Sequence, residues 1–201
     1  MAGERARVPF VGLTGGIAAG KSEALKAFER LGAATLSADA VVHELLTTGE
    51  VRDMLVERFG DDVTSDGEID RGAVAEVVFG DDEQRKWIEG VLWPRVGQRI
   101  WEWRGEQERR DPPPRAAVVE VPLLFEAGMG EAFDATVAIV ADEDVRSERA
   151  GGRGHLAVES RTSRQLTQDE KAQRAGFAIT NDGSLDDLER ELSDFLGRIE
   201  S

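Results

Sequence analysis

Cysteine is absent from the 201 residues, and histidine occurs only at His43 and His155. Without thiols the chain has no disulfide, no thiol nucleophile and no thiolate metal site, and two histidines are too few for a histidine-rich zinc site. Metal chemistry, if present, must therefore use oxygen ligands. We expect His43 to lie on a helix surface and His155 in a loop.

Long hydrophobic runs are also missing. No stretch approaches the roughly 18 apolar residues that can span a bilayer, and the N-terminal MAGERARVPF has no apolar segment like that of a signal peptide. The sequence therefore predicts a cytoplasmic chain without membrane attachment. Its length suffices for one sizeable core, or for one domain with a smaller insertion.

Positive charge is scarce. The net charge is −15, and only four of the 25 basic residues are lysines. Because such a chain repels the phosphates of nucleic acids and anionic lipids, the charge argues against a nucleic-acid or membrane surface. Hydrophobic residues (40%) and charged residues (32%) are mixed along the whole chain, which is typical of a globular protein. The sequence does not indicate an oligomeric state.

Short apolar segments alternate with helical patterns. Helices are predicted over residues 21–31 and 185–199, and a helical stretch from about 41 to 110, broken near 60–70, contains all four tryptophans, which we expect in the core. The segments predicted as strands are 8–14, 33–39, 116–125, 135–140 and 176–180. This alternation predicts an α/β fold with a parallel sheet that helices cover on both faces.

A glycine-rich loop and the polar residues Asp39, Glu120 and Asn181 lie at or just beyond predicted strand ends. Ligands of such sheets bind at the carboxyl ends of the strands. These four segments are therefore expected to meet at one crevice.

The loop itself, GLTGGIAAGKSE (12–23), carries a phosphate-binding pattern. Its Gly15, Gly20, Lys21 and Ser22 fit the spacing Gly, four residues, Gly, Lys, Ser or Thr. In that pattern the backbone N–H groups and the helix N-terminus surround phosphates, the lysine neutralises the β and γ oxygens, and the hydroxyl binds Mg²⁺. A flexible surface turn is the alternative, but the position between a strand and a helix is the one that the motif requires.

Two carboxylates near this loop have alternative roles. Asp39 could accept a proton from an attacking hydroxyl, or it could cap the helix that follows it. Glu120 lies within an apolar strand, where an unpaired charge is costly, so it could face a metal or its waters. Alternatively, Glu120 occupies an edge strand and faces solvent.

The segment 145–174 is basic in an otherwise acidic chain, with seven basic residues against four acidic ones. Its Arg146, Arg149 and Arg153 recur at helical spacing, so that their guanidinium groups could clamp phosphates from one face. The glycines of GGRGH (151–155) would give a closing lid flexible joints. A solvated charged helix is the alternative.

Five ordered motifs together resemble dephospho-coenzyme A kinases, over essentially the whole chain. They are VGLTGGIAAGKS, SAD (37–39), VPLLFEAG (121–128), RTSRQ (161–165) and ITNDGS (179–184). The resemblance implies ATP-dependent phosphorylation of the ribose 3′-hydroxyl of dephospho-coenzyme A, the last step of coenzyme A synthesis. It also implies a phosphate-loop NTPase-type core (1–40, 116–140 and 175–201), a helical substrate domain (41–115) and a helical lid (141–174).

The resemblance also implies roles for individual residues. Asp39 would be the base, and Arg149 and Arg153 would be lid arginines, with Arg149 and Lys21 acting on the transferred group. Asn181 would lie near the adenine, and Ser22 and Glu120 would face Mg²⁺. The residues implied to hold the ATP phosphates are Gly15, Gly16, Ala18, Ala19, Gly20, Lys21, Ser22 and Glu23.

The chain departs from the family pattern at five positions. Ala18 and Ala19 replace the usual Gly and Ser, and Glu23 replaces Thr. Ser37 and Glu120 stand where aspartates are usual, which affects the outer shell of the metal. We nevertheless predict an active kinase, because the phosphate-loop pattern and Asp39 are retained.

Two other functions are compatible with the phosphate loop alone. One is another nucleoside or small-molecule kinase on the same core. The other is a nucleotide-gated switch that transfers no phosphate, although the Asn/Thr-Lys-x-Asp element usual in guanine-type switches is missing from the sequence.

Overall fold

The computed structural model describes residues 7–151 and 165–200. The chain divides into two compact units, Met1–Ser37 with Arg104–Ser201 (unit 1) and Ala38–Trp103 (unit 2). Among the helices of the described ranges, none is both long and apolar enough to cross a bilayer.

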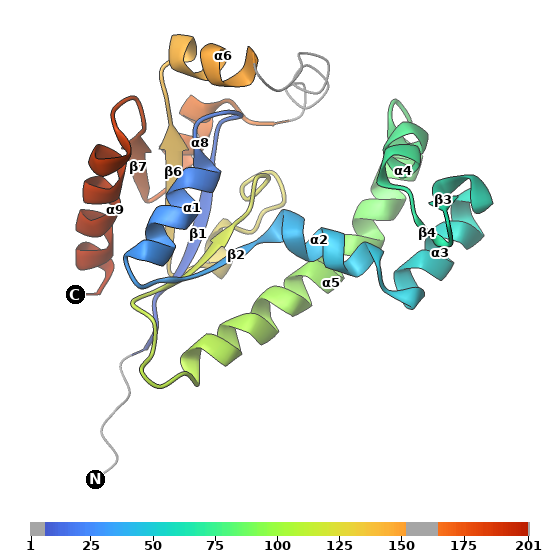
Figure 1. Ribbon diagram of the computed structural model, residues 1–201, viewed down its shortest axis with the longest axis horizontal. Coiled ribbons are helices and arrows are strands. Elements are labelled where there is room, and N and C mark those ends of the chain that lie inside the picture. The colour runs from blue at the N-terminus through green and yellow to red at the C-terminus, as the bar shows by residue number, and fades with distance from the viewer. Residues whose placement is uncertain (1–6, 152–164, 201) are drawn as a thin grey trace. The chain divides into compact units, whose positions relative to one another are not determined.

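Unit 1 is built on a parallel five-stranded sheet in the order β2-β5-β1-β6-β7 (Figure 1). The strands are β1 (Phe10–Gly15), β2 (Ala34–Ser37), β5 (Ala117–Glu120), β6 (Ala135–Val140) and β7 (Phe177–Thr180). All six residues of β1, the central strand, are buried, as expected of a parallel strand covered on both faces. The predicted α/β fold with a parallel sheet is confirmed.

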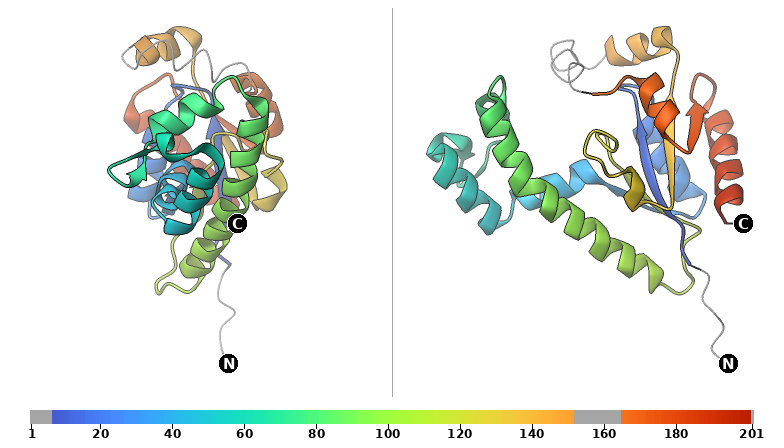
Figure 2. Two further views of the ribbon diagram at one scale, coloured as in Figure 1. Left: turned by 90° about the vertical axis from the view of Figure 1, so that its right-hand side faces the viewer. Right: turned by 180° about the vertical axis from the view of Figure 1, so that it is seen from behind.

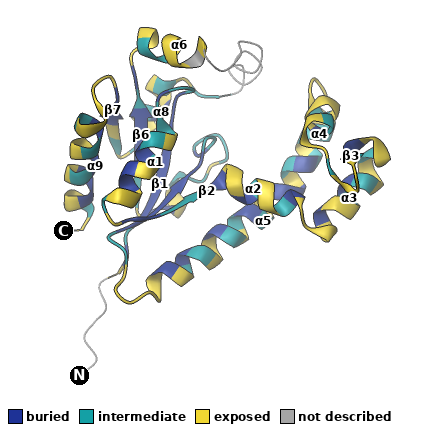
Figure 3. Cartoon of the chain, in the orientation of Figure 1, coloured by how far each residue is buried: buried dark blue, intermediate teal, exposed yellow. Residues whose placement is uncertain are grey.

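Helices cover both faces of this sheet. Helices α1 (Lys21–Arg30) and α9 (Leu185–Ile199) pack against each other on one face, and α8 (Gln168–Arg174) lies on the opposite face (Figures 1 and 2). Between α1 and α9, the rings of Phe28 and Phe195 meet edge to face at 6.0 Å. Figure 3 shows the resulting pattern, with buried residues gathered on the strands and on the inner sides of the helices.

Helix α9 illustrates how local sequence fixes an element. Its buried residues Leu188, Leu192, Phe195 and Leu196 form one apolar stripe. Ser184 accepts a hydrogen bond from the Asp187 N–H, and the Asp187 carboxylate accepts one from the Ser184 N–H, which completes a capping box. Hydrogen bonds from Ser184, together with Arg190, lower the pKa of Asp187 from 3.8 to about 2.

Unit 2 is mainly helical and has its own core. Its elements are α2 (Ala38–Leu46), α3 (Gly49–Phe59), a 3-10 turn (Asp61–Val63), the hairpin β3 (Thr64–Ser65) and β4 (Glu68–Ile69), α4 (Arg71–Val78) and α5 (Asp82–Glu108), whose last residues belong to unit 1. Val51, Leu55 and Val63 are almost fully buried in its core. The helical segment with a break near 60–70 is confirmed, and the small hairpin inside the break is a feature that the sequence did not predict.

The tryptophan prediction is wrong for two residues. Trp93 and Trp101 on α5 are 46% and 54% exposed, while Trp87 is half-buried and meets Phe59 edge to face at 5.3 Å. Trp93 and Trp101 are about two turns apart, so they share a helix face, and this face points to solvent.

Two strands end earlier than predicted. The segment 33–39 is extended only to Ser37, because α2 begins at Ala38. The segment 116–125 is extended only to Glu120, and residues 122–128 form turns. Pro122 has no N–H to donate to a sheet, which explains where β5 ends.

Candidate active site

The glycine-rich loop connects the end of the central strand β1 to the start of α1, at the carboxyl edge of the sheet. At Gly15, φ is +154°, and a Cβ atom would lie 2.2 Å from the carbonyl oxygen of Ile139 on β6. Only glycine can pass this close to the neighbouring strand. The next amide, Gly16 N–H, donates to the same Ile139 oxygen at 3.3 Å, so the loop starts from a fixed position against β6.

Lys21 folds back over this loop. Its ammonium donates to the carbonyl oxygen of Gly16 at 2.9 Å and to that of Gly15 at 3.3 Å. Both acceptors are neutral carbonyl oxygens, and an ammonium group forms stronger hydrogen bonds with charged acceptors.

The far end of the loop is held by Asn181, which follows β7 and is 5% exposed. Its Nδ2 donates to the carbonyl oxygen of Ala19 at 2.8 Å, and its own N–H donates to Val140 O on β6 at 2.8 Å. Gly20 has a φ of +98°, and a Cβ there would lie 2.1 Å from Asn181 Nδ2. The structure therefore places Asn181 against the phosphate loop.

Helix α6 (Glu143–Gly151) brings two arginines to the same place. Arg146 Nε donates to Ile17 O at 3.0 Å, and Arg149 Nη1 donates to Asn181 O at 3.0 Å. The predicted common face of these two arginines is therefore turned towards the loop. Arg153 and His155, with Arg161 and Arg164, lie outside the described residues.

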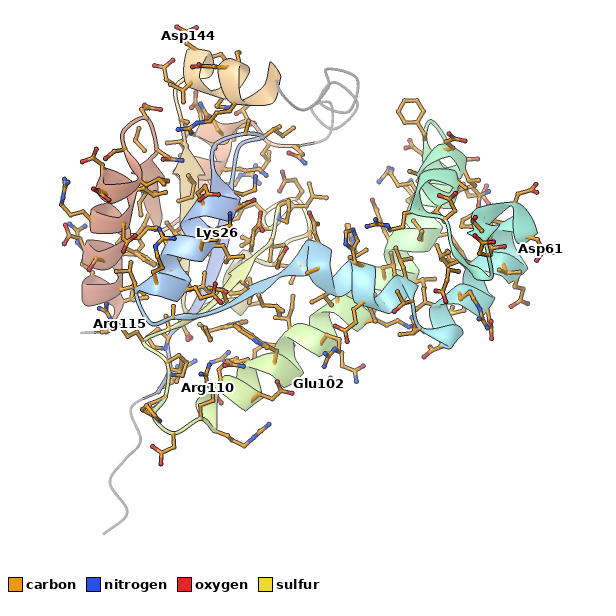
Figure 4. All side chains as sticks on the ribbon, viewed as in Figure 1. Lys26, Asp61, Glu102, Arg110, Arg115 and Asp144 are labelled. Carbon is orange, nitrogen blue, oxygen red and sulfur yellow. The ribbon has the colours of Figure 1, made fainter. Side chains whose placement is uncertain are left out.

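The remaining loop residues differ in their surroundings. Ala18 has a φ of +59°, in the left-handed region where a non-glycine residue is strained, and Ala19 is fully buried. Ser22 is exposed at the start of α1. Glu23 is paired with Lys26 of α1, which Figure 4 labels, at 2.8 Å, so part of its negative charge is balanced locally.

Glu120 is the last residue of β5 and is 9% exposed. Its strand lies between β2 and β1, and Glu120 is in register with Ser37 and Leu13. The edge-strand alternative is therefore wrong. Glu120 therefore ends an interior strand, beside the strand that leads into the phosphate loop.

Asp39 is exposed in the first turn of α2, at the start of unit 2. It is the second residue of that helix, so it does not serve as the N-cap. Since it follows Ser37 by two residues, chain geometry keeps its Cα within about 7 Å of the Ser37 Cα.

Gln168 is a contact residue of the loop that no sequence motif identifies. From the first turn of α8 its Oε1 accepts a hydrogen bond from the Ala141 N–H at 3.1 Å, and its Nε2 donates to Ala141 O at 2.9 Å. Its Cβ would lie 3.1 Å from a Cβ placed on Gly16. No local motif marks this residue, because its partners lie far away in the sequence.

A family model and a similar known protein carry the same description. A family model described as dephospho-CoA kinase matches residues 9–187. A dephospho-CoA kinase from Symbiobacterium thermophilum is 39% identical over 182 residues, which cover 88% of this chain and 75% of the relative.

Two solved structures share the fold over almost the whole chain. A crystal structure of a protein from Thermus thermophilus has a TM-score of 0.81 and 31% identity, covering 96% of this chain and 98% of that one. A dephospho-CoA kinase from Campylobacter jejuni has a TM-score of 0.65 and 25% identity with the same coverage. From the family match over most of its length and the 39% identical relative, this chain belongs to the dephospho-CoA kinase family.

Proposed function

We propose that this chain transfers the γ-phosphoryl group of ATP to the ribose 3′-hydroxyl of dephospho-CoA, giving CoA and ADP. The observation that carries the proposal is the phosphate loop, held between β6 and Asn181, with Lys21 and Arg146 hydrogen-bonded to it and Arg149 hydrogen-bonded to Asn181. Phosphoryl transfer depends mainly on positioning and on neutralising phosphate charge. An arrangement of this kind supports both roles.

The loop and the cations around it would hold ATP. Backbone N–H groups between Ile17 and Ser22 and the N-terminus of α1 would surround the β and γ phosphates. Lys21 would leave the carbonyl oxygens of Gly15 and Gly16 for phosphate oxygens, and Arg149, with Arg153 outside the described residues, would neutralise charge that develops during transfer. Asn181 would then adjoin the adenosine end of the nucleotide.

The donor set fits Mg²⁺ carried by the nucleotide. Within the described residues, three or more His, Asp or Glu side chains nowhere gather into a group that could hold a metal alone. Mg²⁺ commonly takes one or two protein oxygens and completes its shell with phosphates and water. The Ser22 hydroxyl would be a direct ligand and the Glu120 carboxylate would bind the ion or its waters. When bound, Mg²⁺ supplies charge neutralisation at the phosphates.

Asp39 would supply the base. Its carboxylate would take the proton of the 3′-hydroxyl as that oxygen bonds to the γ phosphorus, while the bond from the γ phosphorus to the bridging oxygen breaks and ADP leaves. Segment 41–115 would form the substrate domain, and segment 141–174 would form the lid. The cytoplasmic location stays a prediction from the sequence.

Activity assays test this function and its alternative together. The purified chain is incubated with Mg-ATP and dephospho-CoA, and ADP and CoA are followed over time, with adenosine and other nucleosides as acceptors in parallel reactions. We expect CoA and ADP in equal amounts with dephospho-CoA only. If micromolar enzyme gives no CoA, the proposal is wrong, and phosphorylation of a nucleoside instead would favour the other small-molecule kinase.

A further inference from the structure

One fully buried lysine has no part in the phosphate transfer described above. Lys171 of α8 has an exposed fraction of 0%, and its Nζ lies 3.2 Å from Glu126 Oε1. The same ammonium donates a hydrogen bond to the carbonyl oxygen of Pro122. Because removing a charge from water is costly, a lysine is buried in this way only with a well-placed partner.

Glu126 belongs to the same buried group of hydrogen bonds as Lys171. Its Oε1 also accepts a hydrogen bond from the Leu166 N–H at 2.9 Å, and its side chain is only 15% exposed. Its Oε2 is buried and has no hydrogen-bond partner within the described part of the chain. The pair of Lys171 and Glu126 thus joins the turns after β5 to the segment that enters α8.

The pair also reaches the strand that precedes the phosphate loop. The Pro122 oxygen that accepts from Lys171 accepts a second hydrogen bond, from Thr14 Oγ1, at 3.4 Å. Thr14 is fully buried and directly precedes Gly15. One carbonyl oxygen therefore links the buried ammonium to the end of β1.

Three residues before Lys171, Gln168 makes the second connection. It holds both the N–H and the carbonyl of Ala141 and packs on Gly16 of the loop. Ala141 lies two residues before α6, which carries Arg146 and Arg149. Through Gln168, helix α8 therefore contacts the phosphate loop and is hydrogen-bonded to Ala141, just before α6.

We propose that Lys171 and Glu126 are positioning residues for phosphate transfer. The pair fixes the position of α8 and therefore of Gln168. The contacts of Gln168 with Gly16 and Ala141 in turn position the phosphate loop and the start of α6. This inference rests on the proposed function. A buried ion pair is often no more stabilising than an apolar pair of similar size. We therefore expect the pair of Lys171 and Glu126 to affect the placement of the loop and of α6 more than the stability of the fold.

The double variant Glu126→Gln/Lys171→Met separates these two effects, because it removes both charges with little change in size. We expect its melting temperature to stay near that of the wild type, while kcat falls by about 10-fold or more, since small misplacements of catalytic groups are costly. The single variant Lys171→Met, which leaves the Glu126 charge unpaired, should lose both kcat and melting temperature. Arg198→Met, at an exposed basic residue near the C-terminal end of α9, is the matched control and should change neither.

Wild-type kcat in a folded double variant would overturn the inference. If that variant does not fold, Gln168→Ala tests the same connection, because it removes the contact with Ala141 and leaves the buried pair intact. It should lower kcat and weaken ATP binding, measured by calorimetry, and unchanged values would also overturn the inference. An inactive wild-type enzyme would contradict the proposed function instead, and the ATP dissociation constants of the variants would still test the positioning of the loop.

Discussion

Replacing Gly20 by alanine should damage the phosphate loop through one identifiable contact. With φ at +98°, an alanine would be strained by about 1–2 kcal/mol. Its Cβ would also lie 2.1 Å from Asn181 Nδ2, so the buried amide would have to give up its hydrogen bond to Ala19, at about 1–3 kcal/mol for a buried group left unpaired. The sum predicts a loss of about 2–5 kcal/mol in the free energy of unfolding, with weaker ATP binding.

Gly32→Ala is the matched control for backbone strain. Gly32 has a φ of +90°, but a Cβ there would meet its nearest neighbour, Cδ of Arg115, at an ordinary 3.6 Å. This variant should lose only the strain energy of about 1–2 kcal/mol and should bind ATP normally. Urea unfolding gives both free energies, and calorimetry gives both ATP affinities. Equal losses of stability in the two variants would refute the reasoning, because the contact with Asn181 would then contribute nothing.

A double-mutant cycle tests the same contact from its other side. Asn181→Ala removes the amide that the new methyl group would strike. Gly20→Ala should therefore cost less in this background, by about 0.5–3 kcal/mol, the usual range for residues in contact. Additive losses would mean that the two side chains do not meet.

Three further variants have defined outcomes. Ala18→Gly should raise the free energy of unfolding by up to about 1 kcal/mol, because relief of strain at a φ of +59° exceeds the entropy that glycine adds to the unfolded chain; a loss of stability would contradict this. Ser184→Ala should lower the melting temperature at pH 7 by about 2–4 °C. The folded pKa of Asp187 (about 2) lies below its ordinary value of 3.8, so the stabilisation is present above pH 3.8 and is lost as the pH falls towards 2. The gap between wild type and Ser184→Ala should therefore narrow over that interval, although part of it remains because the hydrogen bond from the Asp187 N–H to the Ser184 hydroxyl does not titrate; a constant gap would argue against the Asp187 carboxylate contact. Asp39→Asn should lower kcat about 100-fold, the usual effect of a general base, with ATP affinity unchanged, whereas the control Asp61→Asn should keep wild-type kcat; a collapse of ATP affinity would make Asp39 a structural or metal-binding residue.

Local patterns predicted much of unit 1. Strand β6 and helix α9 have the bounds expected from the sequence, 135–140 and 185–199. In α9 the signals are all local, since the capping box at Ser184 and the apolar stripe lie within the helix itself. The phosphate loop can also be predicted from the sequence, because its glycines, Lys21 and Ser22 are recognised by their spacing alone.

Contacts between distant segments could not be predicted in this way. Gln168 bonds to Ala141 across 27 positions, and Lys171 bonds to Pro122 across 49. Spacing rules describe which neighbours share a face, and they do not identify a partner in another element. The exposure of Trp93 and Trp101 has the same cause, because burial depends on which face of α5 meets other elements.

The position of the new phosphate tests the central claim most directly. The product of the reaction with Mg-ATP and dephospho-CoA is analysed by mass spectrometry and by phosphorus NMR. We predict a mass gain of one phosphoryl group and one new phosphomonoester signal, coupled to the proton at the ribose 3′ carbon. A phosphate at any other position, or ATP hydrolysis that leaves dephospho-CoA unchanged, would contradict the account.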